Sequence, residues 1–162
     1  MSTENNTKPE YTISEEDKVN FFKAFLADKP YEEEWTLFGG QYKVKFNTLT
    51  TKQTTDVFNQ LRQSQINDEL TNDPNYILTL TNYRLGLALV EIDGKPFNQE
   101  LTEETYTPTS KVDSFVKAKA QVFDTWPIFK LSAIVDAFKA FEHKVVELTD
   151  AIQTENFWKA AK

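Results

Sequence analysis

Residues 35–46 read WTLFGGQYKVKF, with apolar and polar side chains alternating on both sides of a glycine pair. This alternation around Gly39-Gly40 predicts two antiparallel strands joined by a two-residue turn. The turn sets a register in which one face of the hairpin is apolar, and the pairs on that face are Leu37 with Tyr42 and Trp35 with Val44. Because two strands alone are marginally stable in water, we expect this face to lean on helices or on another molecule's sheet.

Helices are predicted on both sides of the hairpin. Before it, Ser14 with Asp17 forms a capping-box pattern that begins an N-terminal helix, and Pro30 ends that helix. After it, Thr50 with Gln53 forms a second capping-box pattern that begins the next helix. The hairpin is therefore expected to join two capped helices.

A third helix is predicted from Asp73 and Pro74 through Val90. Its apolar residues lie nearly all round the helix, which predicts that it is the buried centre of the fold. Residues 90–97 then form either the end of this helix or a short strand that turns at Asp93-Gly94, and the sequence leaves both alternatives open.

The C-terminal part of the chain predicts two more helices, separated at Pro127. In the last helix, apolar residues recur at alternating steps of three and four: Leu131, Ile134, Phe138, Phe141, Val145, Leu148 and Ile152. This heptad pattern favours packing inside the molecule against the third helix, with self-association or partner binding as the alternative.

These elements predict an α+β fold that is mainly α. It comprises an N-terminal helix and a β-hairpin at about residues 31–46, packed on a bundle of about four helices. Residues 1–12 are polar without periodicity, so we expect a flexible N-terminal arm. Residues 13–162 are expected to form a single globular domain that carries a C-terminal aromatic segment.

Composition excludes several classes of function. The 162 residues include no cysteine and a single histidine, His143, so disulfides, thiolate chemistry and multi-histidine metal sites are excluded. A formal net charge of −7 repels a phosphate backbone, so we expect no nucleic-acid partner. No apolar run is long enough to span a bilayer and no signal peptide is evident, so a cytoplasmic protein with no membrane partner is expected.

Signatures of catalysis and cofactor binding are also missing from the sequence. Gly39-Gly40 is the only glycine pair, and no dinucleotide-binding or phosphate-binding loop is present. The carboxylates Asp68, Glu69 and Asp73 lack the spacing of a calcium loop, and a solvated helix break explains them better. His143 is expected to be a solvated surface residue. We therefore expect a protein that is not an enzyme and that has no cofactor or metal.

The aromatic content, 14% of the chain, indicates where a partner could bind. Most aromatic residues fall on helix stripes or on the hairpin face. Trp126 lies at a predicted helix kink, and Phe157 with Trp158 follows the last helix. The predicted partner-binding residues are Trp35, Leu37, Tyr42, Val44, Trp126, Phe157 and Trp158. The alternative for Phe157 and Trp158 is that they fold back over their own core.

The order of these parts resembles a known group of proteins. A hairpin leads into a threonine-capped helix (WTLFGGQYKVKFNTLTTKQTTDVFNQLR), and a central helix closes on a small turn (YRLGLALVEIDGKPF) before an amphipathic helix pair. Over residues 31–158 this resembles small structural and assembly proteins of tailed bacteriophages, of the tail assembly chaperone or baseplate-hub and tail accessory type. The resemblance implies a non-enzymatic role and supplies no catalytic residues.

The expected function is therefore that of a bacteriophage structural or assembly protein that contacts tail, baseplate, neck or other virion proteins. It would act in the host cytoplasm during assembly and could remain in the virion, with a homo-oligomer as a further possibility. Two alternatives from other classes stay open. One is a small cytoplasmic carboxylate-dependent hydrolase, and the other is an acidic regulatory module that binds a host protein.

Overall fold

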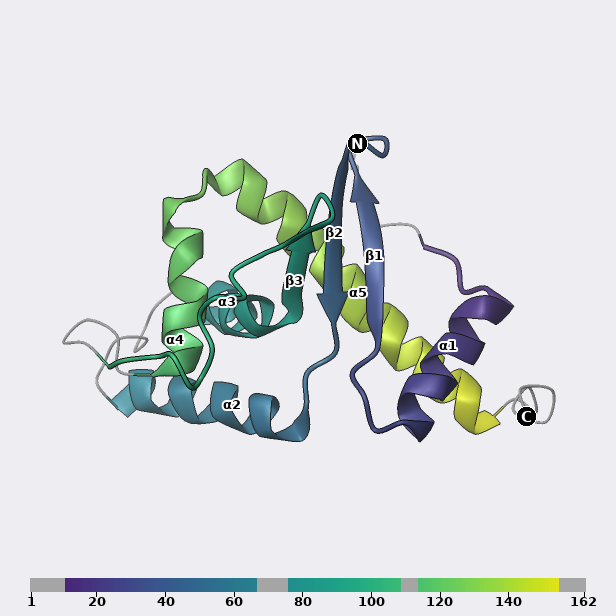
Figure 1. Cartoon of the computed structure of the whole chain (residues 1–162), viewed down its shortest axis with the longest axis horizontal. Helices are drawn as coiled ribbons and strands as arrows, with labels where there is room; N and C mark the ends of the chain where they lie inside the picture. The colour runs from purple at the N-terminus through teal and green to yellow at the C-terminus, as the bar shows by residue number, and fades with distance from the viewer. Residues whose placement is uncertain (1–10, 67–75, 109–113, 155–162) are drawn as a thin grey trace, which may run out of the picture.

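The computed structural model describes residues 11–66, 76–108 and 114–154 (Figure 1). The elements in chain order are α1 (Glu15–Leu26), β1 (Glu32–Leu37), β2 (Tyr42–Asn47), α2 (Thr51–Ile66), α3 (Tyr76–Ala88), β3 (Leu89–Ile92), β4 (Lys95–Pro96), α4 (Phe115–Ala120), the 3-10 helix η1 (Gln121–Thr125) and α5 (Ile128–Thr154). The fold is α+β and mainly α, with an N-terminal helix and a hairpin packed on helices, as predicted.

The hairpin has the predicted register. Leu37 pairs with Tyr42 and Trp35 pairs with Val44 across β1 and β2. The turn uses three residues with positive φ, at 54° for Phe38, 66° for Gly39 and 88° for Gly40. Glycine adopts this left-handed conformation at no steric cost, which explains why a glycine pair sits at the tip.

Residues 89–97 form a second hairpin, which settles the alternative that the sequence left open. The prediction that α3 continues through Val90 was wrong, because the helix ends at Ala88 and β3 pairs with β2. Leu89 is fully buried opposite Phe46, so pairing with the sheet outweighs the helical pattern of the apolar residues. Asp93 and Gly94 form the turn to β4, both with positive φ. The sheet therefore has four antiparallel strands in the order β1-β2-β3-β4.

The apolar stripe of α5 packs inside the molecule. Phe138 and Phe141 contact Phe46 of β2, with ring centroids 5.4 and 5.6 Å apart. Helix α5 also contacts α1, α3 and β1, so the stripe covers the sheet as well as the third helix. Leu131, Ile134 and Leu148 are buried along the same stripe. This confirms the intramolecular alternative and shows that the sheet is a main partner of the stripe.

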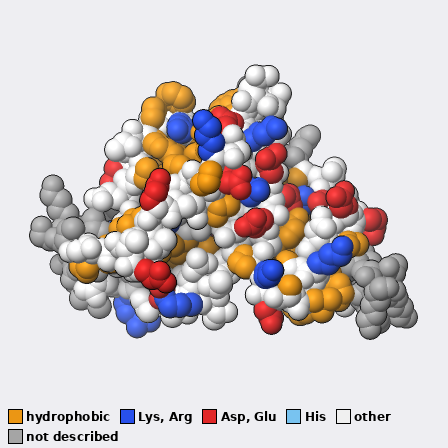
Figure 2. All heavy atoms as spheres, in the orientation of Figure 1, with side chains coloured by type: hydrophobic (Ala, Val, Ile, Leu, Met, Phe, Trp, Pro, Cys, Tyr) orange, Lys and Arg blue, Asp and Glu red, His pale blue; other side chains and the backbone are white. Residues whose placement is uncertain are grey.

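The opposite face of the sheet is polar and faces solvent. Glu32, Glu34 and Lys43 are exposed there, and Lys45 forms an ion pair with Glu91 of β3 at 3.0 Å. Figure 2, which has the orientation of Figure 1, shows acidic and basic side chains over β1 and β2. The sheet thus has one face on the core and one face in water, as is common for antiparallel sheets.

Both predicted capping boxes are present. The Ser14 hydroxyl accepts a hydrogen bond from the Asp17 N–H, and the Asp17 carboxylate accepts one from the Ser14 N–H, both at 3.0 Å. Thr50 and Gln53 make the same reciprocal pair before α2.

Among the described residues, no helix combines the length and the apolar character that crossing a bilayer requires.

Candidate functional site

The predicted partner-binding residues of the hairpin face the interior. Val44 is 1% exposed, so its side chain belongs to the core and offers no surface to a partner in this conformation. This corrects the expectation for Val44, because α5 covers the face that the sequence left open. Trp35, Leu37 and Tyr42 are half-buried and pack against the core. Partner binding by these three residues stays a prediction.

A charged cluster lies at the edge of this interior face. The Lys144 ammonium of α5 lies 2.7 Å from the Glu33 carboxylate of β1 and 3.0 Å from the Asp17 carboxylate of α1. The Tyr31 hydroxyl donates to Glu33, and the Lys144 ammonium also lies 5.9 Å from the centroid of the Trp35 ring. We call Lys144, Glu33 and Asp17 the Lys144 cluster. It joins α5 to α1 and β1, whose two carboxylates lie more than 100 positions before Lys144 in the sequence.

The pKa shifts in the Lys144 cluster follow from burial and pairing. Burial acts to lower the pKa of Lys144, but hydrogen bonds to Glu33 and Asp17 outweigh it and hold that pKa above its usual value. Burial acts to raise the pKa of Asp17, but hydrogen bonds from the Ser14 N–H and from Lys144 hold it below its usual value. The raised pKa of Lys144 and the lowered pKa of Asp17 both favour the charged forms of these two groups near neutral pH.

Tyr11 closes the same edge from the N-terminal side. Its ring lies edge-on to Trp35, with centroids 6.0 Å apart, and its hydroxyl donates to Glu147 at 2.8 Å. Burial and the hydrogen bond to Glu147 raise the pKa of Tyr11 to about 12. His143 is exposed, as predicted, and contacts both Tyr11 and Glu147. Tyr11 belongs to the predicted arm, and the remainder of that arm, residues 1–10, lies outside the described residues.

A second aromatic surface surrounds Trp126. The Trp126 ring is half-buried against Phe123 and Phe97, with centroids 4.9 and 5.6 Å away, and the Lys130 ammonium lies 4.2 Å from its centroid. The next residues after Pro127 point outward: Ile128 is 66% exposed and Phe129 is 75% exposed. We call Trp126, Ile128 and Phe129 the Trp126 patch. Figure 2 shows hydrophobic side chains over the start of α5, where this patch lies.

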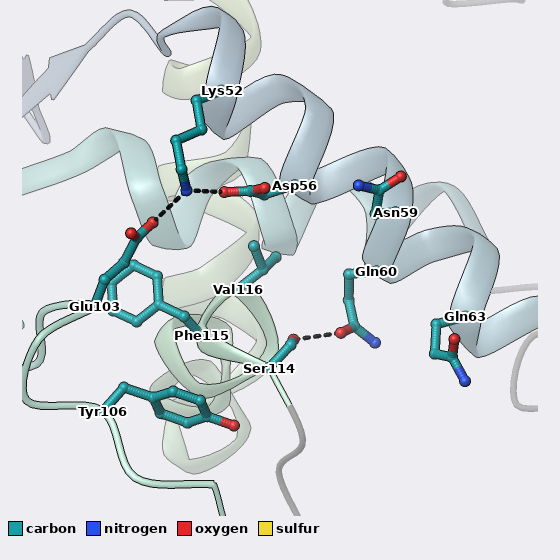
Figure 3. Close-up of a pocket in the computed structure, with 10 residues that line it drawn as sticks. All are labelled: Lys52, Asp56, Asn59, Gln60, Gln63, Glu103, Tyr106, Ser114, Phe115 and Val116. Atoms are coloured by element: carbon teal, nitrogen blue, oxygen red, sulfur yellow. Dashed lines mark hydrogen bonds and ion pairs between the residues drawn. The ribbon is translucent and has the colours of Figure 1, made fainter.

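A polar pocket of about 550 Å³ lies between α2, the segment 103–106 and the start of α4 (Figure 3). Its lining residues are Lys52, Asp56, Asn59, Gln60, Gln63, Glu103, Tyr106, Ser114, Phe115 and Val116. The Lys52 ammonium bridges Asp56 at 2.9 Å and Glu103 at 3.0 Å, and these three residues are called the Lys52 cluster. Hydrogen bonds to Asp56 and Glu103 raise the pKa of Lys52.

The buried wall of the pocket is a hydrogen-bonded chain. The Ser114 hydroxyl, which caps α4, donates to the side-chain carbonyl of Gln60. The Gln60 amide donates to Ser64 at 3.1 Å, and Ser64 lies 3.3 Å from the Tyr83 hydroxyl. The buried polar groups Gln60, Ser64 and Tyr83 therefore satisfy one another, as buried polar groups normally do.

The pocket contains the two carboxylates that a carboxylate-dependent hydrolase would need. Asp56 and Glu103 both pair with Lys52, whereas the general acid of such enzymes lies in apolar surroundings that favour its protonated form. Their arrangement suits the attachment of segment 103–106 to α2. Across the described residues, no group of three histidine, aspartate or glutamate side chains could hold a metal ion.

The structure places the predicted site residues in two separate regions. Trp35, Leu37, Tyr42 and Val44 lie on the inner face of the sheet, and Trp126 lies at the start of α5. Phe157 and Trp158 lie outside the described residues. Sequence reasoning missed Ile128 and Phe129, whose position directly after Pro127 in the first turn of a helix was the available signal.

Comparisons with protein-family models, with curated proteins and with solved structures found no match to this chain.

Proposed function

We propose that this chain is a non-enzymatic structural or assembly protein of a tailed bacteriophage, and that it binds tail, baseplate or neck proteins. The resemblance of residues 31–158 suggests the class of protein. The Trp126 patch supports the mode of action, because two large apolar side chains are exposed beside a tryptophan. The protein would work in the host cytoplasm during assembly and could remain in the virion.

The exposure of Ile128 and Phe129 is the observation that carries this proposal. Burying a large apolar side chain in an interface contributes roughly 1.5–3 kcal/mol. The half-buried Trp126 ring packs against Phe97 and Phe123, and these contacts fix its orientation beside the two exposed side chains. Interface hot spots have this composition, a few aromatic anchors at the centre of the contact.

The charge of the chain leaves one alternative open. A net charge of −7 is compatible with an acidic module that binds a basic host protein. Such binding would weaken strongly with added salt, whereas binding through the apolar Trp126 patch would not. A salt titration of any captured complex therefore separates the two functions.

The test is capture of partners from infected cells with an affinity-tagged chain. We expect the wild-type protein to recover virion proteins and Phe129→Ser to recover roughly tenfold to a hundredfold less, the affinity ratio that corresponds to losing about 1.5–3 kcal/mol. Phe58→Ser is the matched control, because Phe58 is also exposed, at 56%, but lies on α2. Mass spectrometry of purified particles reports whether the protein remains in the virion.

Two results would contradict the proposal at different levels. Equal recovery by Phe129→Ser and wild type would reject the Trp126 patch as the binding surface. If the wild-type protein captured no virion protein and was absent from particles, the phage assembly function itself would be rejected.

A further inference from the structure

Helix α1 has a second apolar side that faces away from the core. Phe21 and Ala24 pack against the core, but Phe25 is 63% exposed and Leu26 is 64% exposed. The half-buried Phe22 ring stacks on Phe25, with centroids 6.2 Å apart and planes 10° apart. The spacing i, i+3, i+4 places these three residues on one side of the helix. We call Phe22, Phe25 and Leu26 the α1 patch.

The α1 patch lies at the corner of the molecule where α5 ends. Helices α1 and α5 pack together, and Figure 1 shows the C-terminal ends of both at the same lower corner. Figure 2 shows hydrophobic side chains over this part of α1. The described part of α5 ends at Thr154, and the sequence continues as ENFWKAAK, residues 155–162, which lie outside the described residues.

The segment brings two aromatic residues within a short reach of the end of α5. An extended chain advances about 3.3–3.6 Å per residue, so Trp158 can reach roughly 14 Å from Thr154. The segment places two large aromatic residues, Phe157 and Trp158, within that reach. Aromatic pairs contribute about 0.5–1.5 kcal/mol beyond the burial of their area, so the rings of the α1 patch are suitable partners.

We propose that residues 155–162 cover the α1 patch of their own chain, with Phe157 and Trp158 as the anchors. A tethered segment binds at an effective concentration in the millimolar range. A second copy or a separate partner would instead lose translational and rotational freedom on binding. This inference is independent of the proposed phage function, because it concerns contacts within one chain.

The test is a disulfide trap. The chain contains no cysteine, so two engineered cysteines supply the only thiols in the protein. Lys23 is exposed on α1 one turn before Leu26, so Lys23→Cys combined with Ala160→Cys places one thiol beside the patch and one beyond the anchors. Under mild oxidation at low protein concentration, we expect an intramolecular disulfide, seen as a monomer with shifted mobility under non-reducing conditions.

A matched control pair is Ser132→Cys with Ala160→Cys. Ser132 is also exposed, but it lies 22 residues before Thr154 on α5, which is about 33 Å along the helix. Six extended residues from Thr154 to position 160 span at most about 22 Å, so this pair cannot close within one chain. The Lys23 pair should therefore form its intramolecular disulfide at least about tenfold faster than the control pair.

A third substitution, Trp158→Ala, is then added to the variant that carries Lys23→Cys and Ala160→Cys. It separates docking of the segment on the α1 patch from random encounter of the two thiols. Loss of the rate advantage on this substitution supports the proposal, because only the anchor has been removed. Three results would overturn it: equal rates for the two pairs, an advantage that survives Trp158→Ala, or disulfide-linked dimers as the main product. The last of these would assign the α1 patch to a second copy of the chain.

Discussion

Lys144 and Lys52 each bridge two carboxylates from different parts of the chain, but they do so in different surroundings. The side chain of Lys144 is 7% exposed, and its partners Glu33 and Asp17 come from β1 and α1. The side chain of Lys52 is 68% exposed, and its partners Asp56 and Glu103 come from α2 and the segment before α4. The distances are nearly the same, at 2.7 and 3.0 Å in the Lys144 cluster and 2.9 and 3.0 Å in the Lys52 cluster.

The difference in burial decides what each cluster contributes. In water, solvent and salt screen an ion pair, so the Lys52 cluster contributes little to stability. In the Lys144 cluster the charges have lost much of their hydration, and each depends on its partners. The comparison teaches that equal geometry does not mean equal energy. None of the twelve residues of α1 is fully buried, so the Lys144 cluster adds to the partial packing of Phe21 and Ala24 in holding this helix on the core.

The largest expected effect is that of Lys144→Met. It leaves the carboxylates of Glu33 and Asp17 without their cation, and breaking a buried ion pair in this way costs about 3 kcal/mol. Urea unfolding followed by circular dichroism measures the loss. The triple variant Lys144→Met, Glu33→Gln, Asp17→Asn should recover most of it, since no carboxylate is then left unpaired. A loss below about 1 kcal/mol for Lys144→Met would show that water already reaches this cluster.

Lys144→Arg is expected to have the next largest effect. The charge is kept, but the larger planar guanidinium must fit where the lysine side chain is enclosed by the Trp35 ring and both carboxylates. Overpacking of this kind costs about 1–3 kcal/mol. The same urea titration measures it, with Lys52→Arg as the control in open surroundings. If both arginine variants matched wild type, the Lys144 site would be as adaptable as the surface.

Acid should weaken the Lys144 cluster through Asp17. Because the pKa of Asp17 is lower in the folded than in the unfolded chain, its contribution is present above the unfolded pKa of about 3.9. That contribution is lost as the pH falls through the lower folded pKa. Thermal melting between about pH 5 and pH 2 should therefore show a shallower loss of stability for Asp17→Asn than for wild type.

Removal of Lys144 gives the control for this pH effect. In the Lys144→Met background, Asp17 has lost one of the two groups that lower its pKa, and Asp17→Asn should change the pH dependence less. An identical change in both backgrounds would attribute the effect to the capping box with Ser14 alone.

The sequence predicted those features whose cause is local. The hairpin register follows from Gly39-Gly40 and from the alternation beside it, and both capping boxes follow from pairs three residues apart. The end of α3 could not be predicted in this way. Leu89 fits a buried helix and a buried strand equally well, and its pairing with Phe46 decided the outcome.

The sequence places each charged residue of the Lys144–Glu33 pair on an apolar face, but only the three-dimensional fold shows that the two faces meet. In the predicted register, Glu33 falls on the same face of β1 as Trp35 and Leu37, so a carboxylate points toward the core. Lys144 falls between Phe141 and Leu148 on the apolar stripe of α5. A carboxylate on one apolar face and an ammonium on another are expected to pair when the two faces pack together. Glu33 and Lys144 are 111 positions apart in the chain, so the sequence alone does not indicate that these two faces meet.

Lys52→Met is expected to have the smallest effect and completes the comparison. Because the ammonium is open to solvent, its removal should shift the urea midpoint only slightly, and added salt should abolish even this shift. A salt series of urea titrations on wild type and variant measures it. If Lys52→Met instead destabilised the protein as much as Lys144→Met, the attachment of segment 103–106 to α2 would be essential to the fold, and burial would no longer explain the difference between the two lysines.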